Sequence, residues 1–340
     1  MDVELPALYC PFPAPGLHPL TDEIQQESLA WGERYDLYPS AEYQAAMHGM
    51  KSSWWFGPAW PDADTERILL FMKHNEIITA LVECWEPFLG DAGRFMDLIV
   101  RMSHTYEVPD AKILDSYPHF MAALEDVLPQ IQALGTPTQY RRWIQTVRDD
   151  WRGNMLECWI GVQKFLDVNT YLTMRARSLN MHSVLIAADL AHGWKVPNDL
   201  LMRPDVRALR CLALTWTGVR NDARGFRLDA SKGQCNFIPH LINETGCTEA
   251  EAISHSVGLM DSLMYRFAEL HDRIINQDIP DSLRHHISNV ARILRATIVY
   301  EKFVRHEWYE YAGDMAQDYA ETPSSTAPPP YPALSWCWSV

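Results

Sequence analysis

Several features that would place a protein in a broad class at once are missing from this chain of 340 residues. No apolar run is long enough to cross a bilayer, and the acidic, proline-rich first residues are unlike a signal peptide. Positive charge is scarce, because 29 Lys and Arg stand against 44 Asp and Glu, for a formal net charge of −15. We therefore expect a cytoplasmic protein that has neither a nucleic acid nor a membrane as its partner.

Paired cysteines and alternating strand patterns are missing as well. The seven cysteines are an odd number without a CxxC pair, which favours reduced thiols over a disulfide framework or a zinc site. No segment alternates apolar and polar residues between turn signals, as a half-buried strand would. With 47% hydrophobic residues, the chain is rich enough in apolar side chains for a large core, and we expect an all-α, single-domain helical bundle.

Three regions of different composition are visible along the chain. Residues 1–62 carry many prolines and aromatics and are expected to form an irregular segment, with one or two helices, packed on the body. Residues 63–315 form the expected all-α domain, and residues 316–340 a Pro/Ser-rich tail that is extended and mobile, with an apolar end, Trp336-Cys337-Trp338, that can dock on the body. Apolar periodicity predicts helices over 65–86, 92–105, 111–127, 137–148, 152–168, 181–193, 204–223, 248–276 and 281–311.

One polar stretch, VRNDARGFRLD at 219–229, follows an apolar helical run that begins at Val206. Asn221, Gly225 and Asp229 are spaced at i, i+4 and i+8 and so share one helical face. Asn and Asp supply the hard oxygen ligands that Mg²⁺ takes, and Gly225 leaves room for a water. The alternative is a polar helix end with a solvated run of charges.

The residues that follow match a known family in order and spacing. NDARGFRLD resembles the second metal-binding motif of class I terpene synthases, and Lys232-Gly233, Asn236 and the GCTEAEA segment at 246–252 resemble its continuation. The resemblance covers mainly the C-terminal half of the chain. It implies an all-α bundle that binds about three Mg²⁺ ions, or fewer, and ionises a prenyl diphosphate.

The resemblance also implies a diphosphate-sensing arginine upstream of the motif. Arg175, in the segment YLTMRARS at 171–178, lies at the typical distance before Asn221, and residues 178–181 would then be the helix break that faces the substrate. The alternative is an exposed Arg on a helix surface. Lys232 and Arg305 are expected to bind the diphosphate too, although relatives carry Arg-Tyr where this chain has Arg305-His306.

The Asp-rich first motif of the family is absent. On the helix expected from residue 65, the polar run Lys73-His74-Asn75-Glu76 stands where paired aspartates are expected. Asn75 and Glu76 offer oxygen ligands to metal, while Lys73 and His74 suit the diphosphate instead. The alternative is that this helix has lost its catalytic role.

Two acidic pairs and two aromatic residues complete the candidates. Asp62–Thr65 resembles the acid motif of class II cyclases but is better explained as a helix N-cap, and Asp149-Asp150 is interpreted as a helix boundary. Phe71 and Trp308 are expected to line the cavity, where an aromatic face stabilises a cation by roughly 0.5–2 kcal/mol.

Taken together, these residues predict an atypical, fungal-like sesquiterpene synthase that cyclises farnesyl diphosphate with Mg²⁺, with a humulene-type hydrocarbon as one product class. An enzyme that releases or transfers an acyclic prenyl group is an alternative, and so is a catalytically inactive isoprenoid-binding relative. A homodimer is an alternative to a monomer that the sequence does not decide.

Overall fold

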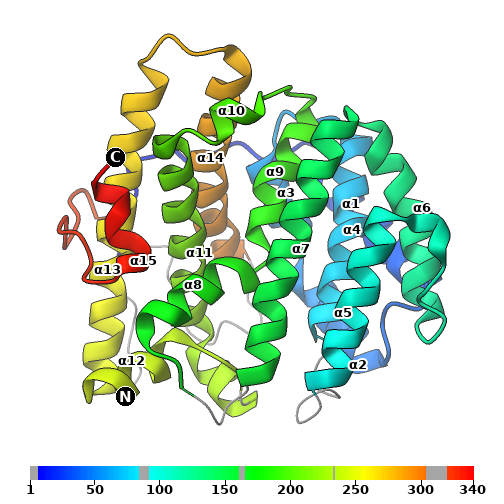
Figure 1. The fold of residues 1–340 in the computed structure, drawn as a ribbon, viewed down its shortest axis with the longest axis horizontal. Helices are drawn as coiled ribbons and strands as arrows, with labels where there is room; N and C mark the ends of the chain where they lie inside the picture. The colour runs from blue at the N-terminus through cyan, green and yellow to red at the C-terminus, as the bar shows by residue number, and fades with distance from the viewer. Residues whose placement is uncertain (1–6, 84–91, 161–164, 233, 304–319) are drawn as a thin grey trace.

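A computed structural model describes residues 7–83, 92–160, 165–232, 234–303 and 320–340, without the side chains of 82, 83, 232 and 301–303. In these ranges the chain is helical and has no strand; Tyr9 and Ala320 form an isolated bridge. The expected all-α class is confirmed, and the long helices pack side by side as one bundle (Figure 1). The α-helices are α1 (Thr21–Arg34), α2 (Ala41–Met50), α3 (Ser53–Ala59), α4 (Thr65–Glu83), α5 (Ala92–Glu107), α6 (Pro118–Ala133), α7 (Pro137–Ile160), α8 (Val168–Ser178), α9 (Met181–His192), α10 (Asn198–Leu201), α11 (Pro204–Lys232), α12 (Phe237–Thr245), α13 (Glu249–Ile275), α14 (Asp281–Phe303) and α15 (Pro332–Ser335).

The N-terminal region is more regular than its proline content suggests. It holds three helices, of which α1 packs against α4 and α3 packs against α14. Trp31 of α1 is buried, and its indole N–H donates to Asp126 at 2.7 Å. Because α3 and α4 meet near Trp60, which is also fully buried, this region forms one wall of the bundle.

The acidic pair Asp149-Asp150 does not end a helix, so that interpretation was wrong. Helix α7 runs through both residues, and the buried Asp150 side chain accepts a hydrogen bond of 2.8 Å from the backbone N–H of Ser183 at the start of α9. A tertiary partner therefore explains the carboxylate. The acidic segment Asp62–Thr65 does act as a helix N-cap, as expected. Asp64 Oδ1 accepts from the backbone N–H groups of Glu66 and Arg67 at the start of α4.

The described part of the tail lies against the body. Cys337 is fully buried, and Arg266 of α13 donates to the carbonyls of Cys337 and Val340. The Asp261 side chain, also on α13, accepts from the backbone N–H groups of both Tyr9 and Ser324. One buried carboxylate thus joins the two terminal segments to the bundle, and residues 320–340 are not the extended, free chain that their composition predicts.

Among the described residues, no helix is both long enough and apolar enough to span a membrane.

Candidate active site

The three residues of the predicted metal-binding face, Asn221, Gly225 and Asp229, all lie in helix α11. Its first turns are apolar and buried, whereas Asn221 and Asp229 lie half-buried along the second half of the helix. At Gly225, one turn from each, an added Cβ would lie 3.1 Å from Asp229 Oδ2 and 3.3 Å from Asp229 Oδ1. Glycine therefore keeps open the space beside the carboxylate, as the sequence predicts for a water or an ion.

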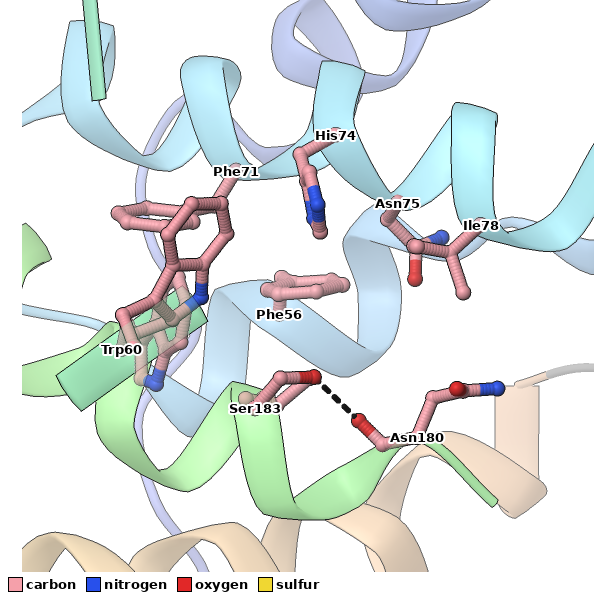
Figure 2. Close-up of a pocket in the computed structure, with 11 residues that line it drawn as sticks. Phe56, Trp60, Phe71, His74, Asn75, Ile78, Asn180 and Ser183 are labelled. Carbon is pink, nitrogen blue, oxygen red and sulfur yellow. Dashed lines mark hydrogen bonds between the residues drawn. The ribbon is translucent and has the colours of Figure 1, made fainter. Parts of the chain in front are cut away.

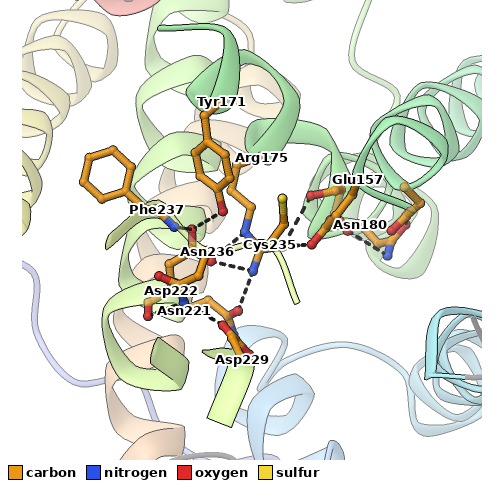
Figure 3. A network of polar contacts seen from close by, with 12 residues as sticks. Glu157, Tyr171, Arg175, Asn180, Asn221, Asp222, Asp229, Cys235, Asn236 and Phe237 are labelled. Atoms are coloured by element: carbon orange, nitrogen blue, oxygen red, sulfur yellow. Dashed lines mark hydrogen bonds and ion pairs between the residues drawn. The ribbon is translucent and has the colours of Figure 1, made fainter. Parts of the chain in front are cut away.

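Arg175 of α8 reaches this face directly. Its side chain is buried, and one guanidinium nitrogen donates to Asn221 Oδ1 at 2.7 Å (Figure 3). The guanidinium also pairs with the Asp222 carboxylate at 2.7 Å and with Glu157 of α7 at 3.5 Å, and donates to the Ser178 hydroxyl at 3.3 Å. An exposed surface arginine is thereby excluded, and the helix break is where it was expected, between α8 and α9.

Asp222 is a central residue that the sequence analysis missed. It is fully buried and accepts hydrogen bonds from the Tyr171 hydroxyl at 2.7 Å and from the Phe237 backbone N–H at 3.1 Å. Burial raises the pKa of Asp222 to about 6, although the Arg175 guanidinium beside it acts in the opposite direction. Asp222 directly follows Asn221 in the sequence, but helical spacing places its side chain off the face shared by Asn221, Gly225 and Asp229.

Asn236 orients the last residue of the predicted metal-binding face. Its side-chain amide donates to Asp229 Oδ2 at 2.6 Å and to the Asp222 carbonyl at 2.8 Å, while its oxygen caps α12 by accepting from the Ile238 N–H. Burial and the nearby Asp222 charge raise the pKa of Asp229 to about 7. A cation at this position would therefore relieve an unfavourable concentration of negative charge.

A cavity of about 220 Å³ opens beside Asn221. Side chains from α3, α4, α9, α11 and α14 line it, together with the α8–α9 break. Half of them are apolar or aromatic, and the other half are Ser, Thr or Asn. The lining residues are Met50, Ser52, Trp55, Phe56, Asn75, Thr79, Leu179, Asn180, Met181, Val184, Thr217, Asn221, Thr297 and Tyr300.

A smaller pocket of about 20 Å³ shares the walls formed by Phe56, Asn75, Asn180 and Val184 (Figure 2). Phe71 lines it, in edge-to-face contact with the buried Trp60 and Trp143. This placement agrees with the expected cavity-wall role of Phe71. At about 20 Å³, this pocket has room for about one water.

The polar run on α4 is split between two faces of that helix. Glu76 is fully buried on the side of α1 and the segment that follows it, where it accepts from the Ser28 and Tyr38 hydroxyls at 2.9 Å each, and burial raises the pKa of Glu76 to about 7. Glu76 lines neither cavity, whereas Asn75 lines both.

His74 was expected to contact the diphosphate, and the structure places its ring among aromatic side chains. The His74 ring is buried against Trp143, and its Nε2 lies 2.7 Å from the Tyr106 hydroxyl at the wall of the smaller pocket. Burial lowers the pKa of His74 to about 3, which keeps the ring neutral and removes its attraction for an anion. Lys73 is not among the residues that line either cavity.

The donors present fit a divalent cation on one side of the cavity mouth. Asn221 and Asp229 supply oxygen atoms, and the space at Gly225 admits a further ligand. No group of three or more His, Cys, Asp or Glu suited to a metal occurs among the described residues. Lys232 ends α11 and its side chain lies outside the described part, as do Arg305 and Trp308 entirely.

A buried Arg, an Asn/Asp face and an aromatic cavity together define a site for an anion attached to an apolar chain. Comparison with known proteins agrees, because the model of terpene synthase family 2, C-terminal metal binding, matches residues 86–266, more than half of the chain. The chain therefore belongs to this family of class I terpene synthases.

Relatives with assigned activities are distant but extend over most of the chain. A bonnadiene synthase of Allokutzneria albata is 23% identical and covers 99% of this chain and 98% of its own. A spiroviolene synthase of Streptomyces violens is 27% identical over 80% of this chain and 77% of its own. A silphinene synthase of Penicillium patulum is 23% identical over 75% and 71%.

The solved structures give the same fold. The SVS_A2 protein from ancestral sequence reconstruction superposes with a TM-score of 0.85 at 26% identity, covering 99% of both chains. Because the similar proteins come from Streptomyces and Allokutzneria as well as Penicillium, they do not single out a fungal source.

Proposed function

We propose that the protein is a Mg²⁺-dependent sesquiterpene synthase that ionises farnesyl diphosphate and cyclises the carbocation. The observation that carries this proposal is the contact between the guanidinium of Arg175 and Asn221, which itself lines a cavity that Trp55, Phe56 and Tyr300 also line. A diphosphate bound there would leave its prenyl chain in the cavity. This arrangement separates the anionic leaving group from the cation that must survive.

Each part of the site has a distinct task in this reaction. Asn221, Asp229 and a water at Gly225 would hold Mg²⁺, which would supply charge stabilisation for the departing diphosphate. Arg175 donates to the diphosphate oxygens, and Lys232 and Arg305 remain proposed as further cationic contacts. Phe56 and Trp55 in the larger cavity and Phe71 in the smaller pocket offer apolar surface to the prenyl chain, so that water does not quench the cation before a proton is lost.

Two considerations favour a C15 substrate. The cavity of about 220 Å³ is modest in size, and the buried Trp60, Phe71 and Trp143 close off the smaller pocket below it. One relative, 22% identical over 95% of this chain, is named as a T-muurolol synthase that cyclises farnesyl diphosphate. A humulene-type hydrocarbon remains our proposed product class.

The α4 side of the cavity supports a second candidate function. None of its described side chains brings a carboxylate to the cavity, because Glu76 points elsewhere. A relative that binds an isoprenoid diphosphate without turning it over would need no more than the α11 side. An acyclic alcohol as product is the intermediate case, in which ionisation occurs and water ends the reaction.

The test is incubation of the purified protein with geranyl, farnesyl and geranylgeranyl diphosphates, with and without Mg²⁺. Gas chromatography with mass detection of the organic layer should show a cyclic C15 product from farnesyl diphosphate that depends on Mg²⁺. Acyclic alcohols alone would support the linear alternative. No product from any substrate would reject the enzyme and favour the binding protein.

A further inference from the structure

The α8–α9 break contains a residue in an unusual backbone conformation. Asn180 has φ +58°, in the left-handed region that non-glycine residues adopt at an energetic cost. It lines both cavities and lies five residues after Arg175. A strained residue at such a place persists only when its surroundings hold it there.

One face of α7 supplies that support. Asp150, Gly153, Asn154 and Glu157 are spaced at i, i+3, i+4 and i+7, so they lie on the same side of the helix. All four are buried, although three of them are polar or charged. Burial of polar side chains on a helix is costly unless each finds a partner, and every one of the three has its partner at the break or at Arg175.

The contacts run in order along this face. Asp150 accepts from the Ser183 backbone N–H at 2.8 Å, which fixes the start of α9. Asn154 donates to Asn180 Oδ1 at 2.9 Å and to the Asp150 carbonyl at 3.1 Å. Glu157 pairs with Arg175 at 3.5 Å, and Figure 3 shows Glu157 and Asn180 on the same side of the site.

Gly153 lets the two backbones approach between these contacts. A Cβ at this position would lie 2.5 Å from the Ser178 backbone nitrogen and 2.8 Å from the Arg177 carbonyl carbon. Both neighbours are backbone atoms of the last turn of α8, so neither can move aside as a flexible side chain would. The absence of a side chain at 153 is therefore what allows Asn154 to reach Asn180.

We propose that this face of α7 is a positioning surface, in which Asn154 holds Asn180 in its left-handed conformation and so sets the relative position of Arg175 and the cavity. The inference rests on the proposed function for its catalytic consequence. Its structural part stands independently, since it concerns the geometry of residues 175–183 with or without a substrate. Asn154 acts through Asn180 and is not itself expected to contact substrate.

The test compares Asn154→Ala with a matched control, Asn169→Ala. Asn169 lies on α8 and accepts one hydrogen bond of 2.8 Å from the Ala333 backbone in the tail, away from the break. Three quantities are measured for each variant: turnover of farnesyl diphosphate, affinity for inorganic pyrophosphate with MgCl₂ by calorimetry, and amide hydrogen exchange over residues 177–183.

For Asn154→Ala we expect pyrophosphate affinity to fall about 10-fold and kcat to fall about 10- to 100-fold, the range typical of residues that orient a ligand-binding group. Exchange at residues 180–183 should accelerate, while Asn169→Ala changes each quantity less than about 2-fold. Asn154→Asp keeps the volume but removes the donor, so it should behave like the alanine variant.

A second substitution tests the proposed route. Glycine adopts positive φ without strain, so Asn180→Gly should reduce the effect of Asn154→Ala in a double-mutant cycle. Additive effects, or unchanged hydrogen exchange at 180–183 in Asn154→Ala, would overturn the inference. If the wild-type protein shows no turnover, only the proposed function is rejected. Hydrogen exchange and a double-mutant cycle based on pyrophosphate affinity still test whether Asn154 holds Asn180.

Discussion

The two sides of the cavity mouth differ in how their polar residues are used. On the α11 side, Asn221, Asp222 and Asp229 face inward and are tied to Arg175 and Asn236 by contacts of 2.6–2.8 Å. On the α4 side, the acidic Glu76 is buried away from the cavity and accepts from Ser28 of α1 and from Tyr38, which lies between α1 and α2. Both helices carry acidic residues, so the orientation of each residue, set by packing, decides which side can bind a cation.

This difference indicates that affinity for the diphosphate is concentrated on one side. The α11 side holds its carboxylates at raised pKa values of about 6 and about 7 for Asp222 and Asp229 because both are buried. A buried carboxylate such as Asp229, close to a second negative charge, gains from a nearby cation. Substitutions on the two sides should therefore have very different effects on activity.

Replacing both Asn221 and Asp229 with Ala should lower turnover of farnesyl diphosphate by ~10²-fold or more, because the positive charge that stabilises the leaving group is lost. The thermal midpoint should change little, since the substitution also removes a buried carboxylate. Turnover is followed by gas chromatography and stability by circular dichroism. Retention of full activity would show that the α11 side is not the metal site.

Gly153→Ala should destabilise the protein by about 1–3 kcal/mol, because the added methyl group overlaps backbone atoms of α8. The free energy of unfolding in urea measures this effect. Gly258→Ala, at a helical position where an added Cβ meets nothing within 4 Å, is the control and should be neutral or slightly stabilising. Equal behaviour of the two variants would mean that α7 and α8 separate easily.

Stability should fall as the pH rises, partly because of Asp150. Burial raises the pKa of Asp150 from 3.8 to about 8, so the folded state binds a proton between these pH values that the unfolded state has released. The native state therefore loses stability from about pH 4 to pH 8, on the order of a few kcal/mol.

Asp150→Asn keeps an acceptor for the Ser183 N–H and does not titrate, so its unfolding free energy should depend less steeply on pH than that of the wild type. Urea unfolding at pH 5 and pH 8 gives the comparison. At pH 8 the free energy of unfolding of the variant should be higher than that of the wild type. Parallel curves for the two proteins would contradict a neutral, buried Asp150.

Gly225→Ala separates stability from function on the α11 side. In the middle of a helix, Ala is favoured over Gly by roughly 0.5–1 kcal/mol, but here its Cβ would lie 3.1 Å from Asp229 Oδ2. We expect stability to be unchanged or slightly higher while turnover and Mg²⁺-dependent pyrophosphate affinity fall about 10-fold, a loss typical for a disturbed ligand. Unchanged affinity would show that no ligand occupies the space at Gly225.

Glu76→Gln should have the smallest effect on activity. The amide oxygen can still accept from Ser28 and Tyr38, and the residue lies away from both cavities, so turnover should stay within about 2-fold of the wild type. Steady-state kinetics with varied MgCl₂ make the comparison. A large rise in the Mg²⁺ concentration needed for activity would show that Glu76 helps to bind the metal. The α4 and α11 sides would then not differ in the way described.

Much of the fold was predictable because its helices carry a clear apolar periodicity. The helices expected over 65–86, 92–105, 181–193 and 248–276 appear within a few residues as α4, α5, α9 and α13. The predicted break between 148 and 152 does not exist, and α8 and α12 were not predicted from periodicity. A charged pair such as Asp149-Asp150 indicates a helix end by composition, but only its buried partner, the Ser183 N–H, shows that the helix continues.

The sequence by itself determined the helical class, the shared helical face of Asn221, Gly225 and Asp229, and the importance of Arg175 beside Asn221, because these depend on spacing along one helix or on a motif. Tertiary structure decided which way each polar residue of α4 faces and what holds the α8–α9 break. Contacts such as Asn154 with Asn180 or Glu76 with Tyr38 join residues far apart in the chain. No local pattern encodes such pairs, since they depend on how helices pack against one another.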